Sequence, residues 1–253
     1  MQELERRLAE ALTGSMVPMD TVMRYVSSVS GKRLRPRLVF LSARLFGEVN
    51  ERVRRTALFV ELLHTATLIH DDVVDESDTR RGQLSVNARW NNKTAVLAGD
   101  YLLSKAMLQL AEPSDSPILK VMLSTAMEMS EGELMQNKEF GVKSEGFYLE
   151  IIKRKTAALM RACCVGGALA GMDENTEDRR QKTELVGDWG LNFGLVFQMQ
   201  DDILDDDDPE ITKMAKALLP AYLEKANKAL DALEPWVKDE WALKELRSLI
   251  RLW

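Results

Sequence analysis

Helical periodicity is the feature of this sequence that most restricts its fold. Apolar residues recur three and four positions apart along nearly the whole chain, and glycines and prolines fall between the periodic segments. No segment alternates apolar and polar residues as a half-buried strand does. The pattern therefore predicts an all-α, single-domain helical bundle without a sheet. We expect helices at residues 3–12, 19–28, 35–46, 51–75, 92–110, 117–138, 146–170, 178–205, 211–232 and 238–251.

Two Asp-rich runs stand inside apolar, helix-forming segments. They comprise Asp71, Asp72 and Asp75 in LLHTATLIHDDVVD, and Asp201, Asp202 and Asp205 in GLNFGLVFQMQDDILD. Residues four apart share one face of a helix, so the first and last Asp of each run are expected to project together. Clustered carboxylates repel one another unless a cation neutralises them. Mg²⁺ takes one or two carboxylates together with substrate phosphates, and two facing pairs therefore predict metal ions that hold a polyphosphate.

A solvated helix end is the competing interpretation of such a run. For a single run the two interpretations are equally good. The presence of two runs, each preceded by an apolar helix and a polar Gln or His, favours the metal site. A Ca²⁺-binding loop is excluded, because the segment after Asp205 lacks the glycine and the terminal glutamate of that pattern.

Basic clusters accompany the acidic runs. They are GKRLRP at 31–36, RRG at 80–82 and the Lys-Thr pair at 155–156. His64 precedes Asp71 by seven residues, two helical turns on the same face, from where it can donate to a phosphate. Arg binds phosphate with a forked donor pair and Lys binds it as a point charge. Any one of these clusters is more often a surface charge, but together with two acidic pairs they indicate two diphosphate groups.

Composition excludes several classes of protein. The net charge is −6 and no basic tail is present, which argues against nucleic acid as the main partner. No apolar run reaches the roughly 18 residues needed to cross a bilayer, so we expect no transmembrane segment. The only cysteines, Cys163 and Cys164, are adjacent and too close for an ordinary disulfide. We interpret them as reduced residues of a cytoplasmic protein.

Five segments together resemble the trans-isoprenyl diphosphate synthase family. They are GKRLRP, ELLHTATLIHDDVVDESDTRRG, NKTAVLAGDYLLSKA, YLEIIKRKTAAL and GLNFGLVFQMQDDILD. These segments cover roughly residues 25–206 in the family's order, and the likeness is greatest to long-chain polyprenyl synthases such as those that make octaprenyl diphosphate. The resemblance implies an all-helical isoprenoid-synthase bundle around a central elongated cavity, Mg²⁺ as the cofactor, and a homodimer.

The resemblance also implies residue roles. Mg²⁺ would be bound by Asp71, Asp75, Asp201 and Asp205, with Asp72 in support. The diphosphate of isopentenyl diphosphate would be bound by Lys32, Arg33, His64 and Arg81. An allylic diphosphate such as farnesyl diphosphate would be bound by Arg80, Lys155, Thr156 and Gln198. The catalytic step would depend on Asp71, Asp72, Asp75, Arg80, Lys155 and Asp201.

The implied reaction adds isopentenyl diphosphate to the allylic diphosphate in successive head-to-tail steps. Ala66 and Thr67 lie five and four residues before Asp71, where the cavity that receives the growing chain is expected. Bulky aromatic residues there would close the cavity early. Because both residues are small, we expect a long trans-polyprenyl product.

The chain departs from the family's pattern after about residue 208. The run DDILDDDDPE leads almost directly into ITKMAKALLPAYLEKANKALDAL, where the family continues with a Lys-containing loop and further helices. Three interpretations are open: the given chain omits a segment, a natural deletion leaves an active enzyme, or catalysis is lost and the protein is a diphosphate-binding partner subunit. A terpene cyclase fits less well, because those enzymes lack the GKR cluster and the second diphosphate pocket.

Overall fold

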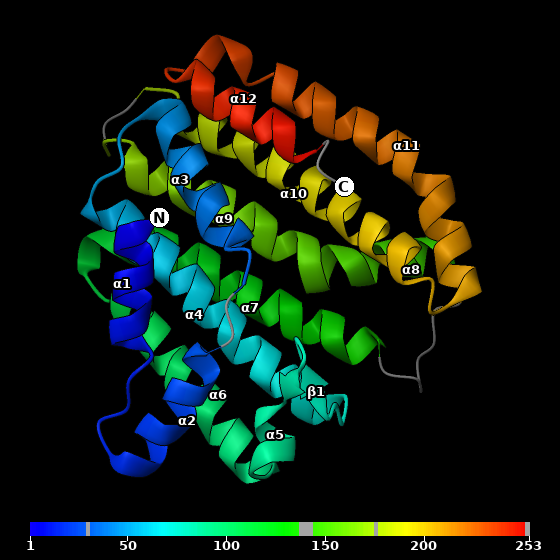
Figure 1. The fold of residues 1–253 in the computed structure, drawn as a ribbon. Helices are drawn as coiled ribbons and strands as arrows, with labels where there is room; N and C mark the ends of the chain where they lie inside the picture. Colours follow the sequence, from blue (N-terminus) through cyan, green and yellow to red (C-terminus); the bar gives the residue numbers. More distant parts are fainter. Residues whose placement is uncertain (29–30, 137–143, 175–176, 251–253) are drawn as a thin grey trace.

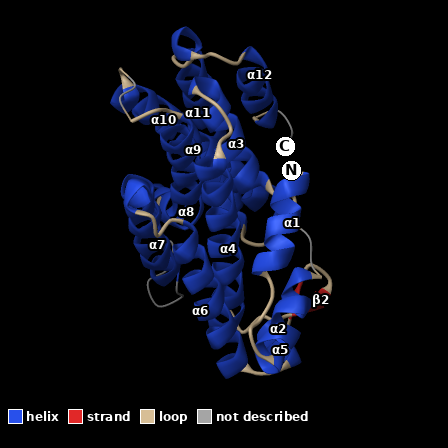
Figure 2. Cartoon of the chain, turned by 90° about the vertical axis from the view of Figure 1, so that its left-hand side faces the viewer, coloured by secondary structure: helices blue, strands red, loops and turns tan. Residues whose placement is uncertain are grey.

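A computed structural model describes residues 1–28, 31–136, 144–174 and 177–250 (Figure 1). The predicted all-α fold is confirmed, and the two views show helices throughout (Figures 1 and 2). The α-helices are α1 (Gln2–Ala11), α2 (Val17–Ser27), α3 (Leu34–Phe46), α4 (Glu51–Val74), α5 (Val86–Arg89), α6 (Asn92–Gln109), α7 (Ser116–Gln136), α8 (Glu145–Ile152), α9 (Ala158–Gly171), α10 (Arg179–Asp205), α11 (Pro209–Asp231) and α12 (Glu240–Leu249). Three short turns complete them: 3₁₀ turns η1 (Pro113–Asp115) and η3 (Glu234–Trp236), and the π-helical turn η2 (Lys153–Ala157).

Within the described residues, the observed helix ends differ from the predicted ones by at most two residues. Residues 137, 138 and 251, predicted as helical, lie outside the described part. The single helix predicted at 146–170 is wrong in one respect, because the π-helical turn η2 separates α8 from α9. No helix of the described residues combines the length and hydrophobicity required to span a bilayer.

A short hairpin follows α4 and corrects the expectation that the chain contains no strand. Strand β1 (Thr79–Arg80) pairs antiparallel with β2 (Gln83–Leu84). The two turn residues between them, Arg81 and Gly82, have φ values of 51° and 79°. Two successive residues in the left-handed region form the tight turn that suits the twist of a hairpin. The strands are too short to show an apolar alternation, so periodicity could not detect them.

Small residues let α9 pack closely against α3. A Cβ atom on Gly167 would lie 2.3 Å from the carbonyl oxygen of Val39, and one on Gly171 would lie 2.8 Å from the Cβ of Ala43. Cys163 and Cys164 are buried in the same helix as free thiols. The ACCVGGALAG segment therefore brings two backbones together, and its cysteines serve as small core residues.

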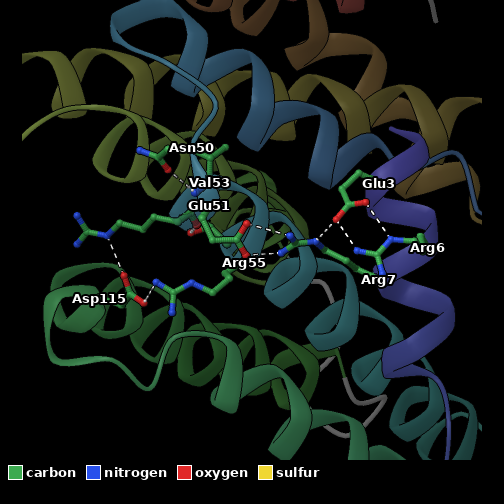
Figure 3. Close-up of polar contacts among 10 residues, drawn as sticks. Glu3, Arg6, Arg7, Asn50, Glu51, Val53, Arg55 and Asp115 are labelled. Carbon is green, nitrogen blue, oxygen red and sulfur yellow. Dashed lines mark hydrogen bonds and ion pairs between the residues drawn. The ribbon is translucent and has the colours of Figure 1, made fainter.

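Ion pairs attach the surrounding elements to the N-terminal end of α4 (Figure 3). The Asn50 side chain caps this helix by accepting a hydrogen bond from the backbone N–H of Val53. Asp115 of η1 is wholly buried, with Oδ2 2.9 Å from a guanidinium nitrogen of Arg55 and Oδ1 2.8 Å from Nε of Arg52. On the other side, Arg7 of α1 binds Glu51 (Figure 3). These contacts fix the start of the helix whose far end carries the first Asp-rich run.

Helices α10 and α11 run side by side and are joined by three residues, Asp206–Asp208 (Figure 1). Asp206 has a φ of 51°, which ends α10, and the Asp208 side chain caps α11 by accepting hydrogen bonds from the backbone N–H groups of Glu210 and Ile211. A separate hydrophobic cluster fills the space between α8, α10 and α11. Its buried members are Tyr148, Ile152, Ala157, Leu195, Met199 and Ala215. The short junction noted in the sequence is thus a well-formed turn that places α11 directly on α10.

Candidate active site

The first Asp-rich run ends α4 and borders a cavity of about 680 Å³ between α4 and α7. Asp71 and Asp75 both line this cavity, as their spacing of four residues predicts. Lys155 lines it from the π-helical turn, with Nζ 2.9 Å from Oε2 of Glu133 and 2.7 Å from Oε1 of Gln136. The cavity therefore combines the two carboxylates at the end of α4 with a lysine from the π-helical turn η2.

Negative charge accumulates around Asp71. Burial raises the pKa of Asp71 to about 6, and the nearby carboxylate of Glu133 contributes to the rise against the lowering effect of Lys155. Glu133 is a residue that the sequence reasoning missed. The available signal was the segment EGELMQ, which places Glu133 and Gln136 one turn apart at the end of α7. The burial of Asp71 and the neighbouring carboxylates together outweigh the effect of Lys155 on this pKa.

Asp72 points away from this cavity. It is 3 % exposed and forms an ion pair with Arg80 of the hairpin, whose Nε lies 2.7 Å from Oδ1. Both residues line a different, small cavity of about 80 Å³. Their pairing holds the hairpin against the end of α4. The role predicted for Asp72 in supporting the Mg²⁺ site and the role predicted for Arg80 in binding the allylic diphosphate stay predictions, and the structure gives both residues a structural contact.

The π-helical turn η2 presents Lys155 and Thr156. A π-helical turn adds one residue to a helical turn, changes the direction of the side chains that follow, and is frequent at functional sites. Thr156 Oγ1 donates a hydrogen bond of 2.8 Å to Oε1 of Gln198. Lys155 thus reaches the cavity, whereas Thr156 and Gln198 bind each other beside it.

The second Asp-rich run ends α10 beside a cavity of about 430 Å³. Asp201 lines this cavity, and Asp205 is exposed on the last turn of the helix. Burial raises the pKa of Asp201, and the carboxylates of Asp205 and Asp202 add to the rise while Lys32 opposes it. The cavity also contains the basic residues Lys32, Arg33, Arg35 and Arg81 together with His64. One carboxylate of the second run therefore faces a largely cationic wall.

Arg35 and His64 form a partly buried pair in that wall. A guanidinium nitrogen of Arg35 lies 2.9 Å from Nε2 of His64. Burial lowers the pKa of His64 well below its usual value, and the charges of Arg35, Arg81 and Arg80 add to this effect. His64 is therefore neutral, and its Nε2 accepts the hydrogen bond from Arg35. His64 lines the cavity with Lys32 and does not line the one with Asp71.

The sequence assigned Arg33, and not Arg35, to a diphosphate site, but the contacts of the two residues favour Arg35. Arg33 is bound by Glu5 and Glu61, with its guanidinium nitrogens 2.9 Å and 2.6 Å from the carboxylates. Arg35 is partly buried, and its Nε, which is shielded from solvent, has no hydrogen-bond partner among the described residues. The sequence reasoning included Arg35 in the basic cluster but did not assign it to the site. Its side chain is available for an anion, whereas that of Arg33 is already paired.

Gly31 makes room for another cation of this wall. A Cβ atom on Gly31 would lie 2.8 Å from a guanidinium nitrogen of Arg81, so the absence of a side chain permits this close approach. Arg81 in turn owes its direction to the left-handed turn of the hairpin. Residues 31–36 and the hairpin at 79–84, far apart in the sequence, thereby contribute to the same cavity.

The two residues predicted as the cavity floor differ in position. Thr67 lines the 680 Å³ cavity together with Met129 and Leu134 of α7. Ala66 is 2 % exposed and packs in the main core. The small residue that faces the cavity is therefore Thr67, and Ala66 lies behind it.

The Asp carboxylates fit a metal ion that is coordinated jointly by protein and substrate phosphates better than a metal ion held by protein ligands alone. Among the described residues, no three His, Cys, Asp or Glu side chains gather into a ready-made metal site. Asp71 with Asp75, and Asp201 with Asp205, are two pairs of carboxylates at helix ends that would offer hard oxygen ligands to a metal ion. Mg²⁺ accepts such a partial set when phosphate oxygens and waters complete its shell. Burial and the nearby carboxylates of Glu133 and Asp75 raise the pKa of Asp71, so a cation bound there would favour its charged form.

The polyprenyl synthetase family model matches residues 17–216 of the chain. Among curated proteins, the chain is 38 % identical over 206 residues to an all-trans-nonaprenyl-diphosphate synthase (geranyl-diphosphate specific) of Rhodobacter capsulatus, which covers 80 % of this chain and 61 % of that protein. It is 36 % identical over 209 residues to the octaprenyl diphosphate synthase of Escherichia coli, with 81 % and 62 % covered. The chain thus spans about three fifths of the length of these relatives.

The structural comparison agrees with the sequence comparison. A polyprenyl synthase from Caulobacter crescentus, solved with calcium and isoprenyl diphosphate, superimposes with a TM-score of 0.80 at 27 % identity and covers 99 % of this chain and 93 % of that one. An isoprenoid synthase family member from Thermotoga neapolitana gives a TM-score of 0.80 at 29 % identity, with 99 % and 96 % covered. These similarities extend through the helices that follow the short junction at 206–208.

Proposed function

Because the chain belongs to the polyprenyl synthetase family, we propose that it is a Mg²⁺-dependent prenyltransferase. It condenses isopentenyl diphosphate with an allylic diphosphate such as farnesyl diphosphate in successive head-to-tail additions. The product is a long-chain trans-polyprenyl diphosphate, in keeping with the names of the relatives that it resembles.

One observation carries this proposal: the two Asp-rich runs border two cavities of different character. The cavity at Asp71 and Asp75 is lined on one side by apolar residues of α4 and α7 and contains a single lysine. The cavity at Asp201 is small and rich in arginine. An allylic diphosphate with a growing hydrocarbon chain fits the first cavity, and a compact five-carbon diphosphate fits the second.

In the first cavity, we assign the allylic diphosphate to Mg²⁺ held by Asp71 and Asp75 and to the ammonium group of Lys155. Thr156 and Gln198, which bind each other beside Lys155, support this subsite. Mg²⁺, when bound, stabilises the negative charge that develops on the departing diphosphate. Lys155 adds a fixed positive charge at the same place, where a low dielectric strengthens its effect.

In the second cavity, we assign the diphosphate of isopentenyl diphosphate to Lys32, Arg35, His64 and Arg81. Arg35 would donate from a partly buried position, where its guanidinium group is oriented by the neutral ring of His64. Holding the double bond of isopentenyl diphosphate close to the ionised allylic carbon makes the attack effectively intramolecular. The double bond of isopentenyl diphosphate is the nucleophile, and the proton lost after bond formation passes to the released diphosphate, so the reaction needs neither a protein nucleophile nor a protein base.

The product length follows from the wall beneath Asp71. Thr67 lies one helical turn before Asp71 and, being small, leaves the cavity open between α4 and α7. A hydrocarbon chain that grows from the diphosphate site runs past Thr67 toward Met129. The open wall supports a long product.

The assembly and the cellular setting are also part of the proposal. The chain forms one polyprenyl-synthase-like domain, shortened after about residue 208, since its main hydrophobic cluster extends from α1 to α12. Exposed apolar side chains on α6 and α7, among them Leu97, Leu108 and Met127, support a homodimer. The two free, buried cysteines are in keeping with a reducing, cytoplasmic location.

Incubation of the protein with isopentenyl diphosphate, farnesyl diphosphate and Mg²⁺ tests the activity. We expect chain elongation, with products resolved by length after removal of the diphosphate. Absence of elongation at every Mg²⁺ concentration would contradict the proposal. The alternative is a partner subunit that binds diphosphate but is not catalytic. Calorimetry would identify it by Mg²⁺-dependent binding of diphosphate without turnover.

A further inference from the structure

Asp202, the middle residue of the second Asp-rich run, is held from both sides. Its Oδ2 accepts a hydrogen bond of 2.6 Å from the hydroxyl of Tyr148 on α8, and its Oδ1 accepts one of 2.8 Å from the amide of Gln198. Both carboxylate oxygens of Asp202 are therefore engaged within the protein. The middle Asp faces α8, whereas Asp201 faces the cationic cavity.

The position of Asp202 makes this contact important for its neighbours. Asp202 and Asp205 belong to the last turn of α10, which ends where Asp206 adopts the left-handed conformation, and Asp201 directly precedes that turn. The last turn of a helix frays readily, since its carbonyl groups lack partners within the helix. Asp202 lies about 100° around the helix from Asp201, so a contact that fixes Asp202 also fixes the direction of Asp201 and Asp205.

Tyr148 is well suited to fix this turn. Its ring is 2 % exposed and packs in the hydrophobic cluster between α8, α10 and α11, with Ile152 and Met199. Burial and the hydrogen bond to Asp202 raise the pKa of Tyr148, so the hydroxyl remains protonated and donates. A rigid aromatic side chain thus presents one donor to a carboxylate at the end of another helix.

The same hydrogen bonds reach the first cavity. Gln198 donates to Asp202 and accepts from Thr156, which follows Lys155 in the π-helical turn. A continuous series of hydrogen bonds therefore joins Tyr148, Asp202, Gln198 and Thr156. It connects the end of α10 to the turn that directs Lys155 toward Asp71.

We propose that Tyr148 is a positioning residue that acts through Asp202 to direct the metal-binding carboxylates of the second Asp-rich run. This role rests on the proposed function, because it concerns the carboxylates that would hold Mg²⁺ and diphosphate. Tyr148 touches neither substrate and takes no part in proton transfer. Its contribution is to keep Asp201 and Asp205 in a fixed direction before the metal binds.

Tyr148→Phe is the informative variant, because it removes the hydroxyl and keeps the packed ring. Tyr222→Phe on α11 is the matched control, since the hydroxyl of Tyr222 has no hydrogen-bond partner among the described residues. With inorganic diphosphate as the probe, calorimetry should show Mg²⁺-dependent binding weakened about tenfold by Tyr148→Phe and unchanged by Tyr222→Phe. In the elongation assay, the Mg²⁺ concentration for half-maximal rate should rise severalfold, with a smaller change in the KM for farnesyl diphosphate.

Hydrogen exchange of the protein without ligands tests the positioning role independently of the activity. Backbone amides at 199–205 should exchange faster in Tyr148→Phe than in the unaltered protein, while those of α3 and α9 should keep their rates. Equal exchange rates at 199–205 would overturn the proposal whether or not the protein elongates prenyl chains. An Asp202→Asn background supplies a further check, because Tyr148→Phe should then weaken diphosphate binding much less.

Discussion

The buried ion pair between Asp72 and Arg80 should stabilise the protein measurably. Asp72 is 3 % exposed, whereas the side chain of Arg80 is about one-third exposed at 35 %. Removing one partner of a fully buried pair costs about 3–5 kcal/mol, and exposed pairs contribute at most about 1 kcal/mol. Arg80→Met leaves the buried carboxylate of Asp72 on α4 without its partner. Because the pair is only partly buried, we expect a cost of about 2–3 kcal/mol.

Thermal unfolding followed by circular dichroism measures this cost. For a protein of this length, about 1 kcal/mol shifts the midpoint by about 2–4 °C, so Arg80→Met should lower it by about 4–12 °C. Asp72→Asn should cost less, since it removes the buried charge, and the double variant should be more stable than the sum of both changes indicates. Arg180→Met is the control, because Arg180 is 92 % exposed and should leave the midpoint unchanged. A midpoint for Arg80→Met within 2 °C of the control would refute this account of the hairpin.

Three further outcomes are expected. The pKa of His64 is lowered in the folded protein by burial and by the charge of Arg35, so stability should fall as the pH drops below about 6.5, where only the unfolded state gains the proton; urea unfolding should show this loss between pH 7 and pH 5.5, and His64→Gln should lack it. Glu133→Gln should bring the pKa of Asp71 down from about 6 toward its ordinary value, because a like charge is removed, and a carboxylate NMR titration would disagree if the value stayed. Thr67→Phe should shorten the polyprenyl product by closing the cavity beneath Asp71, and products of unaltered length would contradict the route assigned to the chain.

The sequence was sufficient wherever the decisive information is local. The spacing of Asp71 and Asp75 determines their shared face, because four residues make about one helical turn. Helix ends were accurate where a capping residue or a glycine marks them, as at Asn50 and Gly47. The order of the five quoted segments was also sufficient to identify the family, which the family model confirms.

The sequence was insufficient where tertiary contacts choose between similar residues. Arg33 and Arg35 are two positions apart in one basic segment, and only the position of Glu61 shows that Arg33 is already paired. Asp72 lies on a different side of the helix from Asp71 and Asp75, and only the fold shows that the hairpin supplies Arg80 as its partner. Glu133 was overlooked because its partner Lys155 is distant along the chain.

The three-residue link between α10 and α11 has a consequence for protein engineering. Closing a longer loop costs free energy only with the logarithm of its length, so extending this link to about thirty residues would cost about 2 kcal/mol. Both flanking helices are capped at the link and pack along each other, and they would keep their contacts across an insertion. The junction is therefore a natural point at which to graft a loop, a reporter domain or a linker directly beside Asp205.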